Sequence, residues 1–139
     1  MITLIYGSTA TNTYMPSDEL LTILEEARIN NAKLNVTGML LFDDGNFLQV
    51  LEGEEDVVTS LYNKICKDPR HTSIMLFVKK KIDKRYFDDW AMGFVDVKQL
   101  DVETIPGYSR FLEDPEHLHK LEDATYAYAF LGVFRDNVR

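Results

Sequence analysis

The sequence predicts an α+β domain in which two helices cover one face of an antiparallel sheet. The first observation is an apolar hairpin at residues 36–53, whose two runs flank the tight-turn sequence Asp43-Asp44-Gly45-Asn46. The second is a helical pattern of apolar residues on each side of this hairpin. The third is a pair of short apolar runs, at residues 2–6 and 74–78, which have the length and composition of buried strands.

The first strand and the first helix precede the hairpin. Residues 2–6 form the strand, and we expect a polar loop over residues 7–13. Ser17 is a good N-cap and acidic residues follow it, which predicts a helix from about Asp18 to Ala32. The inner face of this helix is predicted to consist of Leu20, Leu24, Ala27 and Asn31. Asn35 then occupies a helix-end position, where asparagine can adopt the left-handed conformation.

The second helix and two more strands follow the hairpin. Glu54-Glu55-Asp56 opens the helix and Asp68-Pro69 stops it. Its apolar stripe is predicted to consist of Val58, Leu61, Tyr62 and Ile65. A fourth strand is predicted at residues 74–78 and a fifth at residues 90–97, with Trp90, Met92 and Phe94 on one face. This order is the ferredoxin-like β-α-β-β-α-β arrangement with an additional fifth strand.

The C-terminal segment has a helical pattern of its own. Asp114-Pro115 is a strong helix start, and apolar residues follow at near-helical spacing through Phe134. We expect two units within one domain, residues 1–97 and a C-terminal helical extension at residues 98–139. The extension should pack on the sheet face opposite the first two helices, because that face also needs cover.

Composition excludes several classes of protein. The chain has 139 residues, 45% of them hydrophobic, which favours a packed core over disorder. A formal net charge of −8 argues against nucleic-acid binding. The single cysteine, Cys66, excludes an internal disulfide, and we interpret it as a buried structural thiol. With no signal peptide or membrane-length apolar run in the sequence, we expect a cytoplasmic protein.

Motifs for common enzymatic chemistry are missing from the sequence. It contains neither a G-x-G-x-x-G nor a Walker A motif, and no Ser-His-Asp arrangement is suggested. His117 and His119 are spaced two apart, which points their side chains to different sides of a helix, so no metal site is expected. The sequence therefore predicts a protein without enzymatic activity.

Three polar residues interrupt surfaces that are otherwise apolar. Tyr6 ends the first strand, Asn31 ends the inner face of the first helix, and Gln49 lies inside the third strand. In a ferredoxin-like fold these elements adjoin, so a slot between the helices could be lined by all three. Asparagine and glutamine amides complement a flat heterocycle that carries alternating donors and acceptors. The alternative is that each of the three side chains is satisfied locally, because an unpaired buried polar group costs roughly 1–3 kcal/mol.

Six segments, in order and at near-normal spacing, together resemble the BLUF family of blue-light sensors that use FAD. The most specific are Thr37-Gly38-Met39-Leu40-Leu41 and Phe47-Leu48-Gln49-Val50-Leu51-Glu52-Gly53. The other four begin at Leu4, Ala27, Asp68 and Trp90, and the resemblance covers about residues 2–97. It implies that residues 1–97 form a sensor domain with non-covalently bound FAD, whose ring lies between the two helices.

The resemblance also implies a role for individual residues. Tyr6 matches the redox-active tyrosine and Gln49 the glutamine between that tyrosine and the flavin. Trp90 and Met92 match the pair that competes for the place beside this glutamine. The residues expected to bind the cofactor are Tyr6, Asn30, Asn31, Gln49, Arg70 and His71. The implied mechanism is light-driven electron and proton transfer from Tyr6 to the flavin, which rearranges the hydrogen bond between Gln49 and the flavin.

The expected output is a change in protein–protein contact. We expect a homodimer or larger homo-oligomer that signals to a downstream protein through the C-terminal helices or strand five, without nucleic acid, membrane or metal. Two alternatives remain, a small ferredoxin-like enzyme and a BLUF-like scaffold that has lost its flavin. The first would need a nucleophile or an acid–base pair, and the second would not need Tyr6, Asn31 and Gln49 together.

Overall fold

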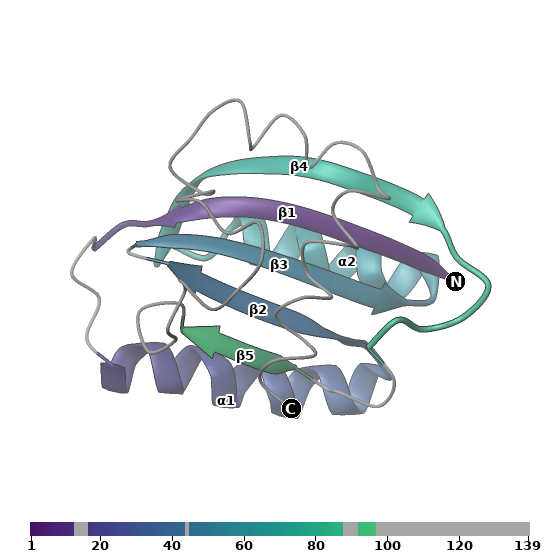
Figure 1. The fold of residues 1–139 in the computed structure, drawn as a ribbon, viewed down its shortest axis with the longest axis horizontal. Coiled ribbons are helices and arrows are strands. Elements are labelled where there is room, and N and C mark those ends of the chain that lie inside the picture. The colour runs from purple at the N-terminus through teal and green to yellow at the C-terminus, as the bar shows by residue number, and fades with distance from the viewer. Residues whose placement is uncertain (13–16, 44, 88–91, 97–139) are drawn as a thin grey trace, which may run out of the picture.

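The structure, a computed structural model, describes residues 1–12, 17–43, 45–87 and 92–96. Within these ranges the chain forms five strands and two helices (Figure 1). They are β1 (Ile2–Ala10), α1 (Ser17–Leu34), β2 (Thr37–Asp43), β3 (Asn46–Gly53), α2 (Glu55–Cys66), β4 (His71–Lys81) and β5 (Gly93–Asp96). No helix in the described part of the chain is long and apolar enough to span a membrane.

The strands form one sheet in the order β4-β1-β3-β2-β5 (Figure 1). β1 pairs antiparallel with both β3 and β4, β2 pairs antiparallel with β3, and β5 adds to the β2 edge in parallel. In the hairpin, Asp43 pairs with Asn46 across a two-residue turn in which Gly45 has a φ of 87°. The ferredoxin-like arrangement with an additional fifth strand is confirmed.

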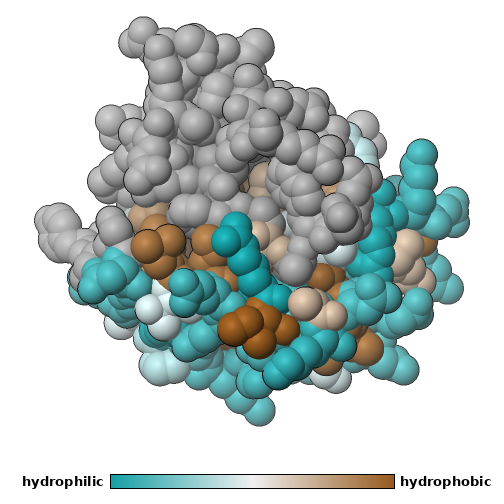
Figure 2. Space-filling view, turned by 90° about the horizontal axis from the view of Figure 1, so that it is seen from below, coloured by the Kyte–Doolittle hydropathy of each residue, from teal (hydrophilic) through white to brown (hydrophobic). Residues whose placement is uncertain are grey.

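Both helices pack on the same face of the sheet. Leu20 and Leu24 of α1 share a core with Val58 of α2 and with strand residues such as Leu4 and Leu51. The predicted stripe of α2 packs against this core, with Val58 buried and Leu61, Tyr62 and Ile65 partly buried. The outer surface of α1 carries both apolar and charged side chains, because Leu21 and Ile29 are exposed there among charged residues. Figure 2 shows separate apolar residues on that side of the molecule.

The end of α1 is fixed by Asn35, as predicted. Asn35 has a φ of 54°, in the left-handed region. Its N–H donates to the Ala32 carbonyl at 3.4 Å, and the Val36 N–H donates to the Asn31 carbonyl at 2.9 Å. These two bonds form a Schellman motif, which satisfies carbonyls that the last helical turn leaves without intrahelical partners. The cap therefore fixes the helix turn that carries Asn31 relative to the start of β2.

Three strand boundaries differ from the sequence prediction. β1 continues to Ala10 through the predicted polar loop, because Gly7, Ser8 and Thr9 pair with β3 on one side and Gly7 and Thr9 with β4 on the other. β4 is likewise longer than residues 74–78, since its first residues pair with the end of β1. β5 begins only at Gly93, so Met92 precedes the strand instead of lying within it as predicted.

The interpretation of Cys66 is also wrong, because this residue ends α2 and is exposed. Its position at the helix end, beyond the last packed turn, explains the difference. The predicted C-terminal extension and its helix start at Asp114-Pro115 lie outside the described residues, as do His117 and His119. The sheet face opposite the helices is buried at Ile5, Leu48 and Val50.

A buried carboxylate fastens the connection that follows β4. Glu52 of β3 is fully buried. Its two oxygens accept the Tyr86 N–H at 2.6 Å, the Phe87 N–H at 3.0 Å and the Thr37 hydroxyl at 3.1 Å. The Arg85 guanidinium donates to Thr37 Oγ1 and to the Glu52 and Asn35 carbonyls. This cluster, Glu52 with its partners, ties residues 85–87 to β2, β3 and the end of α1.

Candidate functional site

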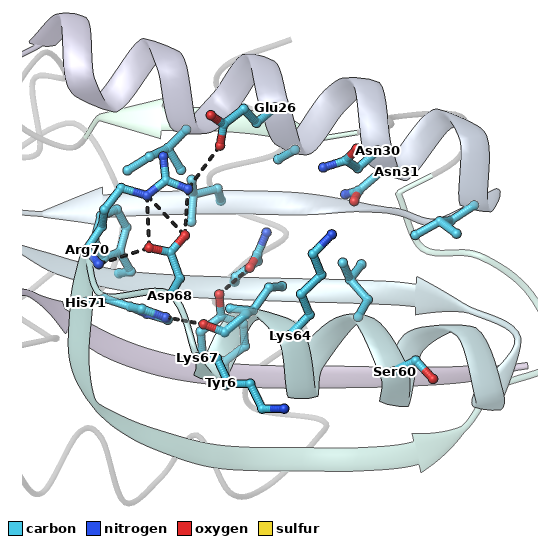
Figure 3. Close-up of a pocket in the computed structure, with 18 of the residues that line it drawn as sticks. Tyr6, Glu26, Asn30, Asn31, Ser60, Lys64, Lys67, Asp68, Arg70 and His71 are labelled. Carbon is cyan, nitrogen blue, oxygen red and sulfur yellow. Dashed lines mark hydrogen bonds and ion pairs between the residues drawn. The ribbon is translucent and has the colours of Figure 1, made fainter.

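A large cavity lies between α1 and α2, above the centre of the sheet. Its volume is about 1100 Å³, which exceeds the usual size of a site for a drug-sized ligand. Asn30 and Asn31 reach it from α1, Ser60 and Lys64 from α2, and Arg70 and His71 from the start of β4 (Figure 3). Tyr6, Phe47 and Gln49 line it from the sheet. The predicted slot between the helices is therefore present.

On the sheet side of the cavity, hydrogen bonds join three side chains in a row. Tyr6 and Gln49 are paired across β1 and β3, which places both side chains on the helix side of the sheet. The Tyr6 hydroxyl donates to Gln49 Oε1, and Gln49 Nε2 donates to Met92 Sδ at 3.5 Å. All three residues are at most 5% exposed. The Gln49 amide thus accepts a hydrogen bond at its oxygen and donates one to a weak, polarisable sulfur acceptor.

The surroundings of Tyr6 keep its phenol protonated. Burial raises the pKa of Tyr6 well above its ordinary value, and the nearby acidic groups of Cys66, Tyr62 and Asp68 raise it further. The Tyr62 ring lies 5.4 Å from the Tyr6 ring, and burial together with a hydrogen bond to Cys66 raises the pKa of Tyr62 to about 12. The Tyr6 phenol therefore stays protonated near neutral pH and can donate its hydrogen bond to Gln49.

The two asparagines of α1 lie in different environments. Asn31 is 2% exposed and Asn30 is exposed, yet both line the cavity (Figure 3). Asn31 is placed there because it continues the stripe of Leu20 and Leu24, whose side chains are buried. A buried amide beside a cavity can present a donor and an acceptor to one ligand edge.

Arg70 and His71 both lie at the cavity, and both already have protein partners. Arg70 donates to Asp68, with the shortest contact at 2.6 Å, and to Glu26 of α1 at 3.0 Å (Figure 3). The hydrogen bond from Arg70 holds the pKa of Asp68 below its usual range. His71 Nε2 lies 2.6 Å from the Ile65 carbonyl and Nδ1 lies 2.8 Å from Ser8 Oγ. These contacts close one end of the cavity by linking α1, the end of α2 and β4.

The cavity brings together most of the residues that sequence reasoning selected. The cavity is lined by Tyr6, Asn30, Asn31, Gln49, Arg70 and His71. Met92 accepts a hydrogen bond from Gln49, which lines the cavity. Trp90 lies outside the described residues. In the described part of the chain no group of three or more His, Cys, Asp or Glu side chains could hold a metal ion.

Sequence reasoning missed the contacts of two residues, Arg28 near the site and Glu52 on the opposite face of the sheet. Arg28 of α1 donates from Nε to the Met92 carbonyl at 2.9 Å, and nothing in its exposed helical position indicates this contact. Glu52 could have been identified from the sequence, because a carboxylate at a buried strand position needs hydrogen-bond partners as much as the Gln49 amide does.

The fold and the cavity define a ferredoxin-like domain that can hold a large cofactor between two helices. The BLUF family, described as sensors of blue-light using FAD, matches residues 1–93. The chain belongs to this family, and its cofactor is FAD.

Similar proteins include a photoactivated cyclase subunit and a light-regulated antirepressor. The chain is 40% identical over 93 residues to the photoactivated adenylate cyclase subunit beta of Euglena longa, covering 66% of this chain and 11% of that protein. It is 35% identical over 102 residues to the blue light- and temperature-regulated antirepressor BluF of Escherichia coli (strain K12), covering 70% of this chain and 24% of BluF. The chain therefore spans a small part of both relatives.

In two solved structures the similarity extends over most of both chains. The dark-state structure of BlrB, a BLUF protein, matches with a TM-score of 0.67 and 31% identity, covering 89% of this chain and 96% of that chain. The photo-activated state of BlsA matches with a TM-score of 0.70 and 30% identity, covering 88% and 92%.

Proposed function

We propose that this protein senses blue light through a hydrogen-bond switch at Gln49 and passes the signal to a partner protein. The observation that carries the proposal is the buried chain Tyr6–Gln49–Met92 at the wall of a cavity of about 1100 Å³. FAD, when bound, supplies blue-light absorption and an acceptor for one electron and one proton.

The contacts of Tyr6, Gln49 and Met92 support a separate role for each of these three residues. Tyr6 is the donor, because its phenol is buried, protonated and hydrogen-bonded to Gln49. Gln49 receives the phenol hydrogen bond at Oε1, so a rotation or tautomer change of its amide exchanges a donor for an acceptor beside the cavity. Met92 loses or regains the Nε2 contact in that exchange, since its sulfur is the other partner of this amide.

Cofactor binding divides between amides and cations. We assign Asn31 and Asn30 to the flavin ring, an assignment supported by their position on the cavity wall. The phosphates need positive charge, and Lys33, Lys64 and Lys67 supply it from the two helices and the turn after α2. The positive charge of Arg70 is balanced by Asp68 and Glu26. Arg70 and His71 therefore shape the cavity wall more than they add positive charge to it.

The central test is the colour and light response of the purified protein. We expect it to be yellow, to release FAD on denaturation without a covalent link, and to shift its absorption slightly to the red under blue light. A protein that stays colourless after incubation with FAD, or that binds FAD without any light-induced shift, would overturn the proposal.

Asn31→Ala should weaken flavin retention. The side chain is 2% exposed and lines the cavity, so its removal leaves the ring without one amide partner. We expect the FAD affinity to fall about tenfold, the loss expected for a hydrogen bond of about 1.4 kcal/mol. Flavin per protein and the melting temperature of the apoprotein are measured together. Asn63→Ala, at an exposed position of α2, is the matched control. A lower melting temperature with unchanged flavin content would mean that Asn31 only caps the helix.

The output should be carried by strand β5. Met92, beside Gln49, immediately precedes β5, and β5 pairs with β2 at the sheet edge. We propose that the amide change at Gln49 alters β5 and, through it, contacts with a second copy of this chain or a downstream protein. Hydrogen exchange in the dark and under blue light should differ at residues 93–96 and within residues 115–134. Differences confined to residues that line the cavity would contradict this route.

A further inference from the structure

Met92 is held in place by contacts other than strand pairing. It precedes β5, whose ladder with β2 begins at the pair Met39–Gly93. Met92 is nevertheless 2% exposed, and its sulfur accepts from Gln49 Nε2 at 3.5 Å. Because a methionine side chain is unbranched and flexible, its sulfur stays beside one amide only if the backbone that carries it is fixed.

Arg28 supplies such a fixed point. Its Nε donates to the Met92 carbonyl at 2.9 Å, a charge-assisted hydrogen bond from the middle of α1. Arg28 lies three residues before Asn31, so the same stretch of α1 lines the cavity and holds the backbone of Met92. Met92 in turn links this stretch to Gln49 on β3.

We propose that Arg28 is a positioning residue for the light response: its hydrogen bond to the Met92 carbonyl holds Met92 Sδ beside Gln49 and so favours one orientation of the Gln49 amide. The proposal rests on the proposed switch at Gln49. Loss of the Arg28 bond frees Met92, weakens the sulfur contact and removes the bias on the amide, which changes how fast the lit state returns to the dark state.

A merely structural role would look different. If Arg28 only joined α1 to the start of β5, its loss would lower stability or flavin content and leave the Met92 side chain and the recovery rate unchanged. Two variants separate the hydrogen bond from the charge. Arg28→Leu removes every donor, whereas Arg28→Gln keeps an N–H donor at the same number of bonds from Cα without the charge. Glu25→Gln, an exposed position of the same helix, is the matched control.

The first measurement does not depend on photochemistry. The methyl carbons of the methionines are labelled and the Met92 resonance is assigned by its absence in Met92→Leu. We expect this resonance to move or broaden in Arg28→Leu and to stay near its wild-type position in Arg28→Gln and Glu25→Gln. An unmoved Met92 resonance in Arg28→Leu would overturn the proposal, and Arg28→Ala provides the same test if the leucine variant does not fold.

The second measurement is the dark recovery of the absorption shift after a blue pulse. Arg28→Leu should change its rate about threefold or more, as the loss of one ordinary hydrogen bond would, and Arg28→Gln should restore most of it. In the Met92→Leu background the Arg28→Leu effect should be largely lost, since the two residues act through one contact. A full Arg28→Leu effect in that background would contradict the route through Met92.

If wild-type protein binds FAD without a light-induced shift, the proposed function fails; if it shifts normally and Arg28→Leu recovers like Glu25→Gln, only the role of Arg28 fails.

Discussion

Tyr6→Phe should abolish the light-induced red shift while the protein still binds FAD. The variant keeps the ring, which packs in the core beside Tyr62, but removes the phenol proton that Gln49 Oε1 accepts. A phenylalanine is also a much poorer electron donor. Because a positioned proton donor typically accounts for a hundredfold or more in rate, we expect the yield of the shifted state to fall by at least about a hundredfold. Difference absorption before and after blue light measures this.

Tyr62→Phe is the matched control for this variant. Its ring lies 5.4 Å from that of Tyr6, so the variant removes a neighbouring hydroxyl, yet this hydroxyl is not part of the contact with Gln49. We expect this variant to shift normally, whereas Gln49→Leu, which removes the amide, should bind FAD and not shift. A normal shift in Tyr6→Phe would exclude Tyr6 as the donor and leave the proposed switch without its first step.

Glu52→Ala should strongly destabilise the fold. Glu52 is fully buried and accepts the Tyr86 and Phe87 N–H groups and the Thr37 hydroxyl. Alanine leaves these donors without their acceptor in a site closed to water, at a cost of about 1–3 kcal/mol for each unsatisfied group. Since the losses are only partly additive, we expect the free energy of unfolding to fall by about 3–5 kcal/mol and the melting temperature by about 10 °C or more.

Glu54→Ala is the matched control, because Glu54 is the same residue type two positions along, exposed and without a side-chain cap bond to α2. Its cost should stay within about 0.5 kcal/mol. Equal losses in the two variants, measured by urea unfolding, would mean that the Glu52 cluster does not stabilise the fold.

The contribution of Glu52 should also depend on pH. Burial raises the pKa of Glu52 above its ordinary value of 4.5, although the Tyr86 and Phe87 N–H groups, Thr37 and Arg85 oppose the rise. A carboxyl with a raised pKa in the folded state stabilises most below its unfolded pKa and loses that contribution as pH rises through the folded pKa. The difference in unfolding free energy between wild type and Glu52→Ala should therefore decrease from pH 4.5 upward.

The sequence alone determined the features that depend on local chemistry. The hairpin turn follows from Gly45, whose φ of 87° few other residues adopt, and the end of α1 follows from Asn35 with its φ of 54°. The inner stripe of α1 follows from its period, and it correctly placed the buried Asn31 beside a cavity. Gln49 was identifiable because an amide in an apolar strand needs partners, which the structure provides in Tyr6 and Met92.

Only the tertiary structure decided features that depend on pairing between distant segments. Ser8 and Thr9 have a loop-like composition, yet they extend β1 because both pair with β3 and Thr9 also pairs with β4. Cys66 follows an apolar stripe but is exposed, because the helix ends where the packing ends. Arg28 has an ordinary exposed position, and its bond to the Met92 carbonyl exists only because β5 adds to the sheet edge beside α1. Contacts of this kind join residues more than sixty positions apart, and no local pattern of residues encodes them.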